Sequence, residues 1–190
     1  EIDIALGLDQ ESFEVNTAAA RLYFMQGLHN DAIRFYEKAA TLMPSDFSSV
    51  AMLQTCYTAI GDTEAVRRAA ERTLARAEKI AAQEPDNGMA MGYTVIALAD
   101  LGEGERAREL AKRAMLLDPD NLTMLYNFGC SFARLRDFEM AIDVLGPVLE
   151  KDTAETVNWA KVDPDLDGVR EHPRFKAMLA KADARLRGER

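Results

Sequence analysis

Small and hydrophobic residues recur along the chain at a fixed distance of 34 positions, with polar and charged residues between them. The matched positions are Tyr23 and Tyr57, Gly27 and Gly61, Leu98 and Phe132, Ala107 and Ala141, and Pro85 and Pro119. A period of this length is typical of a repeated unit made of two helices and a turn. The pattern therefore predicts an all-α chain in which antiparallel helix pairs stack into a solenoid.

Within each predicted unit, small residues lie where the two helices approach closely, and large residues around them can interdigitate. A glycine suits the turn, and a proline ends the second helix. The residues that fit are Ala20, Tyr23, Gly27, Ala32, Tyr36, Ala39 and Pro44 in residues 13–46, Leu98, Gly102, Ala107, Ala111, Ala114 and Pro119 in residues 88–121, and Leu125, Phe128, Gly129, Phe132, Ala141 and Ile142 in residues 122–152. In these residues and in its period, the chain resembles the tetratricopeptide repeat (TPR) family over most of its length. The resemblance implies a right-handed α-solenoid that holds a partner segment on its concave side.

The second unit, residues 47–87, is longer than the others. Gly61 and Gly102 are 41 residues apart, which is seven more than the period. The extra residues lie in the strongly helical run GDTEAVRRAAERTLARAEKIAAQEP, and seven residues make about two turns of α-helix. We therefore expect the second helix of this unit to be two turns longer than its counterparts and to project beyond the array.

Residues 1–12 also follow the repeat pattern. Ile2 and Ala5 fall where a second helix places its packing residues. The segment is therefore interpreted as the tail of a preceding unit whose first helix is missing. Because arrays seldom begin with half a unit, we expect the chain to be part of a longer protein.

Three alternating aspartates begin the stretch DPDLDGVREHPRF, as they do in calcium-binding EF-hand loops. The likeness fails at the twelfth position, where Arg174 replaces the bidentate glutamate, and we expect no metal site. Asp163 before Pro164 and His172 before Pro173 instead predict helix caps with proline in the first turn. Residues 153–190 are expected to form a helical cap on the last unit. The side chains expected to pack there are those of Leu166, Val169, Phe175 and Trp159.

This carboxyl-terminal part resembles the end of certain bacterial multidomain signalling proteins, in which a TPR array follows an effector domain. The effector is often a class III adenylate or guanylate cyclase, and sometimes a Ser/Thr kinase or a DNA-binding domain. The matching residues are Tyr126, Asn127, Cys130, Asp163, Pro164, Asp165, Asp167, Arg170, Pro173, Arg174 and Phe175, whereas Gly168 departs from an expected proline. The resemblance implies a regulatory role beside an effector that these residues do not identify.

Composition limits the classes of partner. Of the 190 residues, 48% are hydrophobic and 29% charged, as in globular proteins. A net charge of −9 disfavours broad contact with nucleic acid or anionic lipid, and no apolar run is long enough to span a membrane. Cys56 and Cys130 suggest neither a disulfide framework nor a zinc site. We expect a cytoplasmic protein that neither inserts into membranes nor binds nucleic acid.

The sequence lacks a catalytic constellation. His29 lies in a predicted turn and His172 at a helix start, and neither has a cysteine or serine partner nearby in sequence. No glycine-rich phosphate loop is present, because GEGER (residues 102–106) belongs to a turn between helices. We therefore expect a non-enzymatic chain without catalytic residues, metal or cofactor.

The candidate site is the concave face formed by the first helix of each unit. Small residues there leave room for a ligand, while methionine, tyrosine and arginine offer apolar contacts and charge. The residues assigned to it are Thr17, Arg21, Met25, Ala51, Thr55, Thr58, Met89, Gly92, Ile96, Asp100, Tyr126, Cys130 and Arg134. A groove that binds a peptide and a mere lining between stacked helices both remain open at this stage.

Two functions fit the sequence. The first is a protein-interaction scaffold whose partner is a protein, a peptide or a sister domain, in the C-terminal regulatory part of a bacterial signalling protein such as an adenylate cyclase. The second is self-association, in which a homodimer of the repeats pairs two effector domains. A free-standing adaptor is a further alternative.

Overall fold

The computed structural model describes residues 7, 9–84 and 87–188, so Ile2, Ala5 and Pro85 lie outside the described residues. The described part contains eleven α-helices, one short 3-10 helix and no strand, which confirms the all-α prediction. The elements of the array are α2 (Phe13–Met25), α3 (His29–Leu42), α4 (Ser48–Ile60), α5 (Thr63–Gln83), α6 (Gly88–Asp100), α7 (Gly104–Leu117), α8 (Leu122–Arg134) and α9 (Phe138–Lys151). None of the described helices is both long and apolar enough to cross a membrane.

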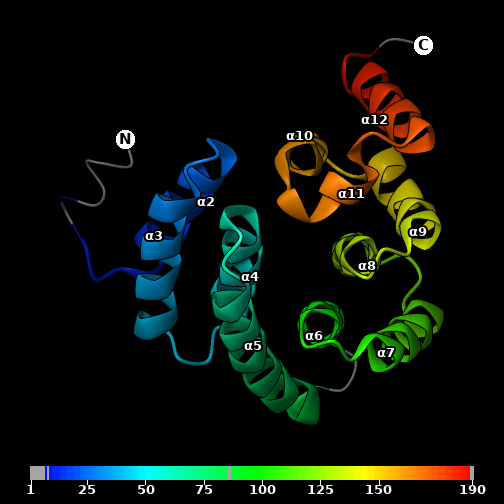
Figure 1. The fold of residues 1–190 in the computed structure, drawn as a ribbon. Coiled ribbons are helices and arrows are strands. Elements are labelled where there is room, and N and C mark those ends of the chain that lie inside the picture. Colours follow the sequence, from blue (N-terminus) through cyan, green and yellow to red (C-terminus); the bar gives the residue numbers. More distant parts are fainter. Residues whose placement is uncertain (1–6, 8, 85–86, 189–190) are drawn as a thin grey trace.

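Helices α2 to α9 form a curved array in which each helix packs against the next (Figure 1). Short turns close the pairs α2–α3, α4–α5, α6–α7 and α8–α9. Each turn contains one residue with a positive φ, namely Gly27 (73°), Gly61 (75°), Gly102 (79°) and Arg136 (59°). The intervals between these residues are 34, 41 and 34 positions, so the turn geometry follows the repeat even where the chain has an arginine in place of glycine.

Helix α5 is the longest described helix. It has 21 residues, whereas α3, α7 and α9 have 14 each, and the difference of seven equals the extra sequence between Gly61 and Gly102. Two arginines of α5 tie it to the preceding pair. Arg76 donates to the backbone carbonyl of Asp46 at 2.6 Å, and Arg72 forms an ion pair with Glu37 at 2.8 Å.

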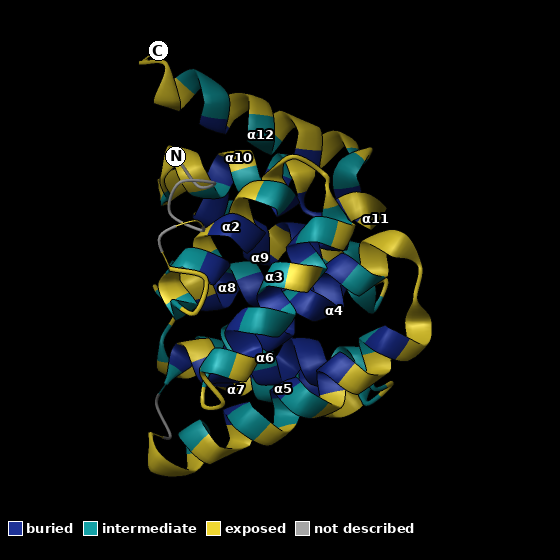
Figure 2. Cartoon of the chain, turned by 90° about the vertical axis from the view of Figure 1, so that its left-hand side faces the viewer, coloured by how far each residue is buried: buried dark blue, intermediate teal, exposed yellow. Residues whose placement is uncertain are grey.

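Alanine and glycine allow the helices of a pair to approach closely. Ala107, Ala111 and Ala114 of α7 have no exposed surface. A Cβ atom on Gly129 of α8 would lie only 2.5 Å from Cγ of Leu145 in α9, so no larger residue fits there without a shift. Buried residues run through the middle of the array, as Figure 2 shows in dark blue.

The chain ends in α10 (Ala154–Val162), the 3-10 helix η1 (Pro164–Leu166), α11 (Asp167–Arg170) and α12 (Pro173–Leu186). Helix α12 packs on α9, whereas η1 contacts both α4 and α8. The C-terminal segment, defined here as residues 153–171, therefore lies inside the curve of the array (Figure 1). The expected place of Trp159 on the last unit was wrong, because its ring stacks on Phe24 of α2 at 4.5 Å between centroids.

The two predicted caps are confirmed. The Asp163 side chain accepts a hydrogen bond from the Asp165 amide, with Pro164 in the first turn of η1. The His172 side chain accepts one from the Arg174 amide at the start of α12. Both caps satisfy backbone donors that have no partner within their own helix.

Candidate binding site on the concave face

The concave face is formed by the inner helices α2, α4, α6 and α8, and all the residues assigned to it from the sequence lie on these helices. Arg21 lies on α2, Thr55 on α4, and Tyr126 and Arg134 on α8. Each of these four side chains contacts the C-terminal segment of the same chain. The concave face therefore carries an occupant, and that occupant is an acidic part of the chain itself.

Arg134 lies at the centre of the contact. Its side chain is 8% exposed and forms ion pairs with Asp100 of α6 and, at 2.6 Å, with Asp165 of η1. It also donates to the Thr58 hydroxyl at 3.3 Å. Although burial lowers the pKa of Arg134, the attraction of Asp165 and Asp100 outweighs it and raises that pKa above its ordinary value. A guanidinium this deeply buried requires such counterions, so Arg134 joins the array to the C-terminal segment.

Asp163 is buried without a cation at ion-pair distance among the described residues; its side chain accepts hydrogen bonds instead. The Tyr126 hydroxyl donates to Oδ2 at 2.7 Å, Cys130 Sγ lies 3.7 Å from the same oxygen, and the Asp165 amide donates to Oδ1 at 3.0 Å. Burial, and next the nearby charge of Asp165, raises the pKa of Asp163 to about 7. Burial likewise raises the pKa of Tyr126 and of Cys130. This carboxyl group is therefore poised to change its charge near neutral pH.

Among the described residues, the grouping of possible metal ligands is Cys130, Asp163 and Asp165, whose ligand atoms lie within 4.8 Å of one another. Asp165 is already paired with the Arg134 guanidinium at 2.6 Å. A divalent cation would lie beside that positive charge, and the repulsion opposes binding. The cluster fits a docking contact better than a metal centre.

Arg170 holds the C-terminal segment in its bent shape. Its guanidinium donates to the carbonyls of Ala160 at 3.3 Å and of Asp163 at 2.6 Å, and also to the carbonyl of Lys161. It is paired with the exposed carboxylate of Asp167 at 2.8 Å. The alternating aspartates thus have different roles, because Asp163 and Asp165 face the array whereas Asp167 orients Arg170.

A cavity of about 320 Å³ remains between the concave face and the C-terminal segment. Seven residues assigned to the concave face from the sequence line it: Thr17, Arg21, Ala51, Thr55, Ile96, Tyr126 and Cys130. Met25 and Met89 are 37% and 46% exposed and lie outside it, as do Thr58, Gly92, Asp100 and Arg134. We call this space the seam cavity.

Four aromatic residues line the seam cavity, namely Tyr36, Tyr93, Tyr126 and Trp159. Sequence reasoning placed only Tyr126 in the site. Tyr36 comes from an outer helix, α3, and Trp159 from the C-terminal segment, so the register of the inner helices gave no signal for either. Trp159, Leu166 and Val169 marked this segment as a packing element, but the sequence did not show that Trp159 packs against α2.

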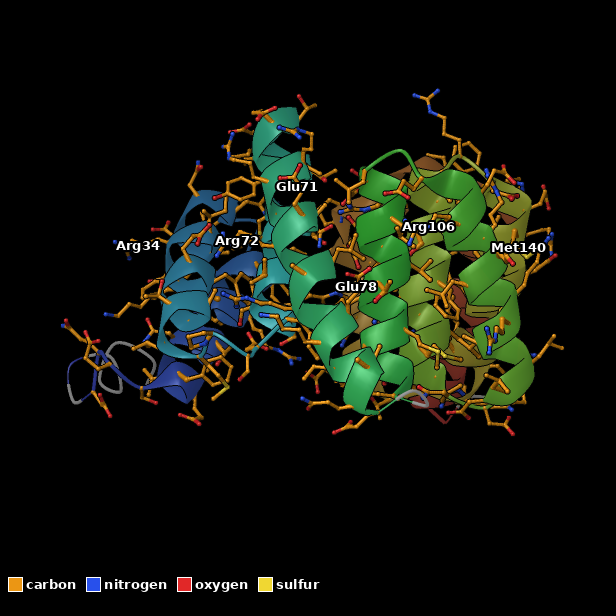
Figure 3. The ribbon with its side chains drawn as sticks, turned by 90° about the horizontal axis from the view of Figure 1, so that it is seen from below. Arg34, Glu71, Arg72, Glu78, Arg106 and Met140 are labelled. Atoms are coloured by element: carbon orange, nitrogen blue, oxygen red, sulfur yellow. The ribbon has the colours of Figure 1, made fainter. Side chains whose placement is uncertain are left out.

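The outer surface differs from this site. Exposed charged side chains cover the outer helices α3, α5 and α7, among them Arg34, Glu71 and Arg106, which Figure 3 labels. Glu71 pairs with Arg67 of its own helix at 2.7 Å. Such exposed pairs add little to stability. The outer surface is therefore interpreted as a solvated face.

Comparison of the chain with protein-family models and with curated proteins found no match. The case for a function therefore rests on the contacts and cavities described above and on the sequence.

Proposed function

We propose that the chain is a non-catalytic protein-interaction module built of TPR-type helix pairs, and that its concave face binds a short acidic segment. Two observations support the assignment of TPR-type helix pairs: the intervals between the turn residues and the 14-residue length of three outer helices. On the resemblance noted above, the module would serve as the C-terminal regulatory part of a bacterial signalling protein, where the partner is a sister domain or another protein.

One observation carries the proposal: the way the concave face holds the turn Asp163–Asp165. Arg134 and Thr55 bind the Asp165 carboxylate at 2.6 and 3.0 Å, and Tyr126 binds Asp163 at 2.7 Å. Charge-assisted hydrogen bonds of this kind give a surface selectivity for carboxylates. A partner with two aspartates in a similar turn would find the same donors, in competition with the chain's own segment.

The test uses a fluorescein-labelled peptide of residues 153–171 added to the full chain, with binding followed by fluorescence anisotropy. Asp165→Asn weakens the attached segment, so this variant should bind the peptide about tenfold more tightly than the unmodified chain does. Glu171→Gln, which removes an exposed carboxylate of the same segment, is the matched control. A peptide with asparagine at both buried aspartates should not bind. Equal binding of the two peptides, or no binding to any variant, would contradict the proposal.

Self-association is the second candidate function, and one surface feature favours it. Leu116 and Leu117 are adjacent at the end of α7 and are 85% and 66% exposed, which is unusual for two neighbouring leucines in a monomer. Sedimentation velocity would detect a dimer that Leu116→Glu abolishes. A concentration-independent monomer would remove this candidate.

A further inference from the structure

Helix α10 presents a regularly spaced row of side chains to the array. Glu155, Trp159 and the C-cap residue Asp163 follow one another at intervals of four residues, and residues four apart lie on the same face of an α-helix. Glu155 pairs with Arg21 of α2. The Asp163 side chain accepts a hydrogen bond from the Tyr126 hydroxyl of α8 at 2.7 Å. The array therefore contacts a helical row in which an aromatic residue lies between two carboxylates.

Trp159 is the aromatic residue of this row, and two side chains of α2 contact it. Its ring stacks on the buried ring of Phe24, with 4.5 Å between the centroids and 16° between the ring planes. The Arg21 guanidinium lies 5.5 Å from the centre of the Trp159 ring, within the range of a cation–π interaction. Tryptophan and arginine are the side chains that most often dominate binding interfaces. Helix α2 therefore gives the concave face a subsite for an aromatic residue.

The attached segment does not fill the concave face. The seam cavity of about 320 Å³ remains beside this row, and the side chains of the array that line it include Met52, Tyr93 and Ile96. On the side of α10, Thr156 borders the cavity with a short polar side chain. A gap in an interface forfeits van der Waals contacts. A ligand with a larger apolar residue at the position of Thr156 would therefore contact the array more closely than the chain's own segment does.

We propose that the concave face recognises a short helix of another protein in which an acidic, an aromatic and a second acidic residue follow at intervals of four. The inference rests on the proposed function and specifies the partner. The aromatic residue of the partner occupies the place of Trp159 on Phe24, and its carboxylates bind Arg21 and Tyr126. A bulky apolar residue three positions before the aromatic one fills the seam cavity, in the spacing by which amphipathic helices bind grooves. The chain's own segment lacks that bulky residue, so such a partner can displace it.

The experiment compares labelled peptides of residues 153–171 for binding to the full chain that carries Asp165→Asn, in the same anisotropy assay. A peptide with Trp159→Ala keeps every carboxylate and should bind about tenfold more weakly, because it lacks the aromatic anchor. An alanine inserted after Lys161 turns Asp163 by about 100° relative to the tryptophan and should also weaken binding about tenfold. An alanine added at the amino end of the peptide leaves the spacing intact, so this control should bind like the unmodified peptide.

A further peptide tests the cavity. Thr156→Leu should bind about fivefold more tightly than the unmodified peptide, because the larger apolar side chain is buried in the seam cavity. Asn158→Leu, at an exposed position of the same helix, is the matched control and should leave the affinity unchanged. Equal affinities of the unmodified, Trp159→Ala and Lys161-inserted peptides, or no gain from Thr156→Leu, would overturn this inference alone, because the acidic peptide would still bind. Absence of binding by every peptide would overturn the proposed function as well.

Discussion

Replacing Asp163 by asparagine should change how stability depends on pH. In the folded chain, burial raises the pKa of Asp163 to about 7, well above the value of 3.8 for a free side chain. The folded state therefore holds a proton that the unfolded state has lost between these two values. The contribution of Asp163 to stability is then greatest at low pH and falls as the pH rises toward 7. Asparagine has the shape of the protonated carboxyl group, keeps the cap of η1, and carries no charge to desolvate.

The magnitude follows from the size of the shift. Each pH unit between the unfolded and folded pKa values changes the free energy of unfolding by about 1.4 kcal/mol for one proton. From pH 5 to pH 8, the stability of Asp163→Asn relative to the unmodified chain should therefore rise by about 3 kcal/mol. Asp100, whose pKa burial raises to about 6, contributes in the same direction. His29, whose pKa burial lowers, contributes in the opposite direction. Both are present in the two proteins, so they cancel in the difference.

Urea unfolding followed by circular dichroism at pH 5, 6, 7 and 8 measures this difference. Glu171→Gln provides the control for loss of one carboxylate from the same segment, since its side chain is 82% exposed. A difference between Asp163→Asn and the unmodified chain that stays constant over this range would refute the reasoning. Asp163 would then be ionised throughout, and the Tyr126 and Asp165 hydrogen bonds would have compensated fully for its burial.

Four further substitutions test the packing and the backbone geometry. Arg136→Gly should raise the free energy of unfolding by about 1 kcal/mol, because a side chain at φ 59° is strained; a lower melting temperature would contradict this. Gly129→Ala should cost about 1–3 kcal/mol, because its Cβ would lie 2.5 Å from Leu145. Gly146→Ala, where the nearest atom beyond its chain neighbours is 4.0 Å away, should cost less than Gly129→Ala, although a Cβ before Pro147 disfavours the helical backbone; equal costs for both would show that close approach is not the cause. Trp159→Ala should cost about 2 kcal/mol in urea unfolding, since the ring is only partly buried, and an unchanged midpoint would contradict the observed stacking.

The helix pairs were predictable because their determinants are local and periodic. Gly27, Gly61 and Gly102 lie where the chain needs a positive φ, and the 34-residue spacing of the first two locates their turns. The longer α5 followed from counting residues between two of them. The fourth turn shows the limit of that reasoning. Arg136 adopts the positive φ there, and an arginine gives no sequence signal for such a turn.

The course of the C-terminal segment was not predictable in the same way. Its contacts join residues far apart in sequence, such as Thr55 and Asp165, which are separated by 110 positions. Such pairs depend on the complementarity of single side chains and leave no period to detect. The sequence suggested helix caps at Asp163 and His172, since a cap is decided within a few residues. It did not suggest that the Asp163 side chain would also accept a hydrogen bond from the Tyr126 hydroxyl.

The C-terminal segment is covalently attached to the array, so it competes with any separate partner for the concave face. The segment follows α9 after a single residue, Asp152, so its effective concentration at the concave face is about millimolar or higher. A separate partner must outcompete that concentration, and a moderate affinity for the empty face would be insufficient. The ratio of docked segment to bound partner changes more easily when the affinity of the segment for the concave face changes. Ionisation of Asp163 would loosen it, because the charge is buried with no cation at ion-pair distance among the described residues. On this reasoning, a partner should bind the concave face most strongly at a pH where Asp163 is ionised.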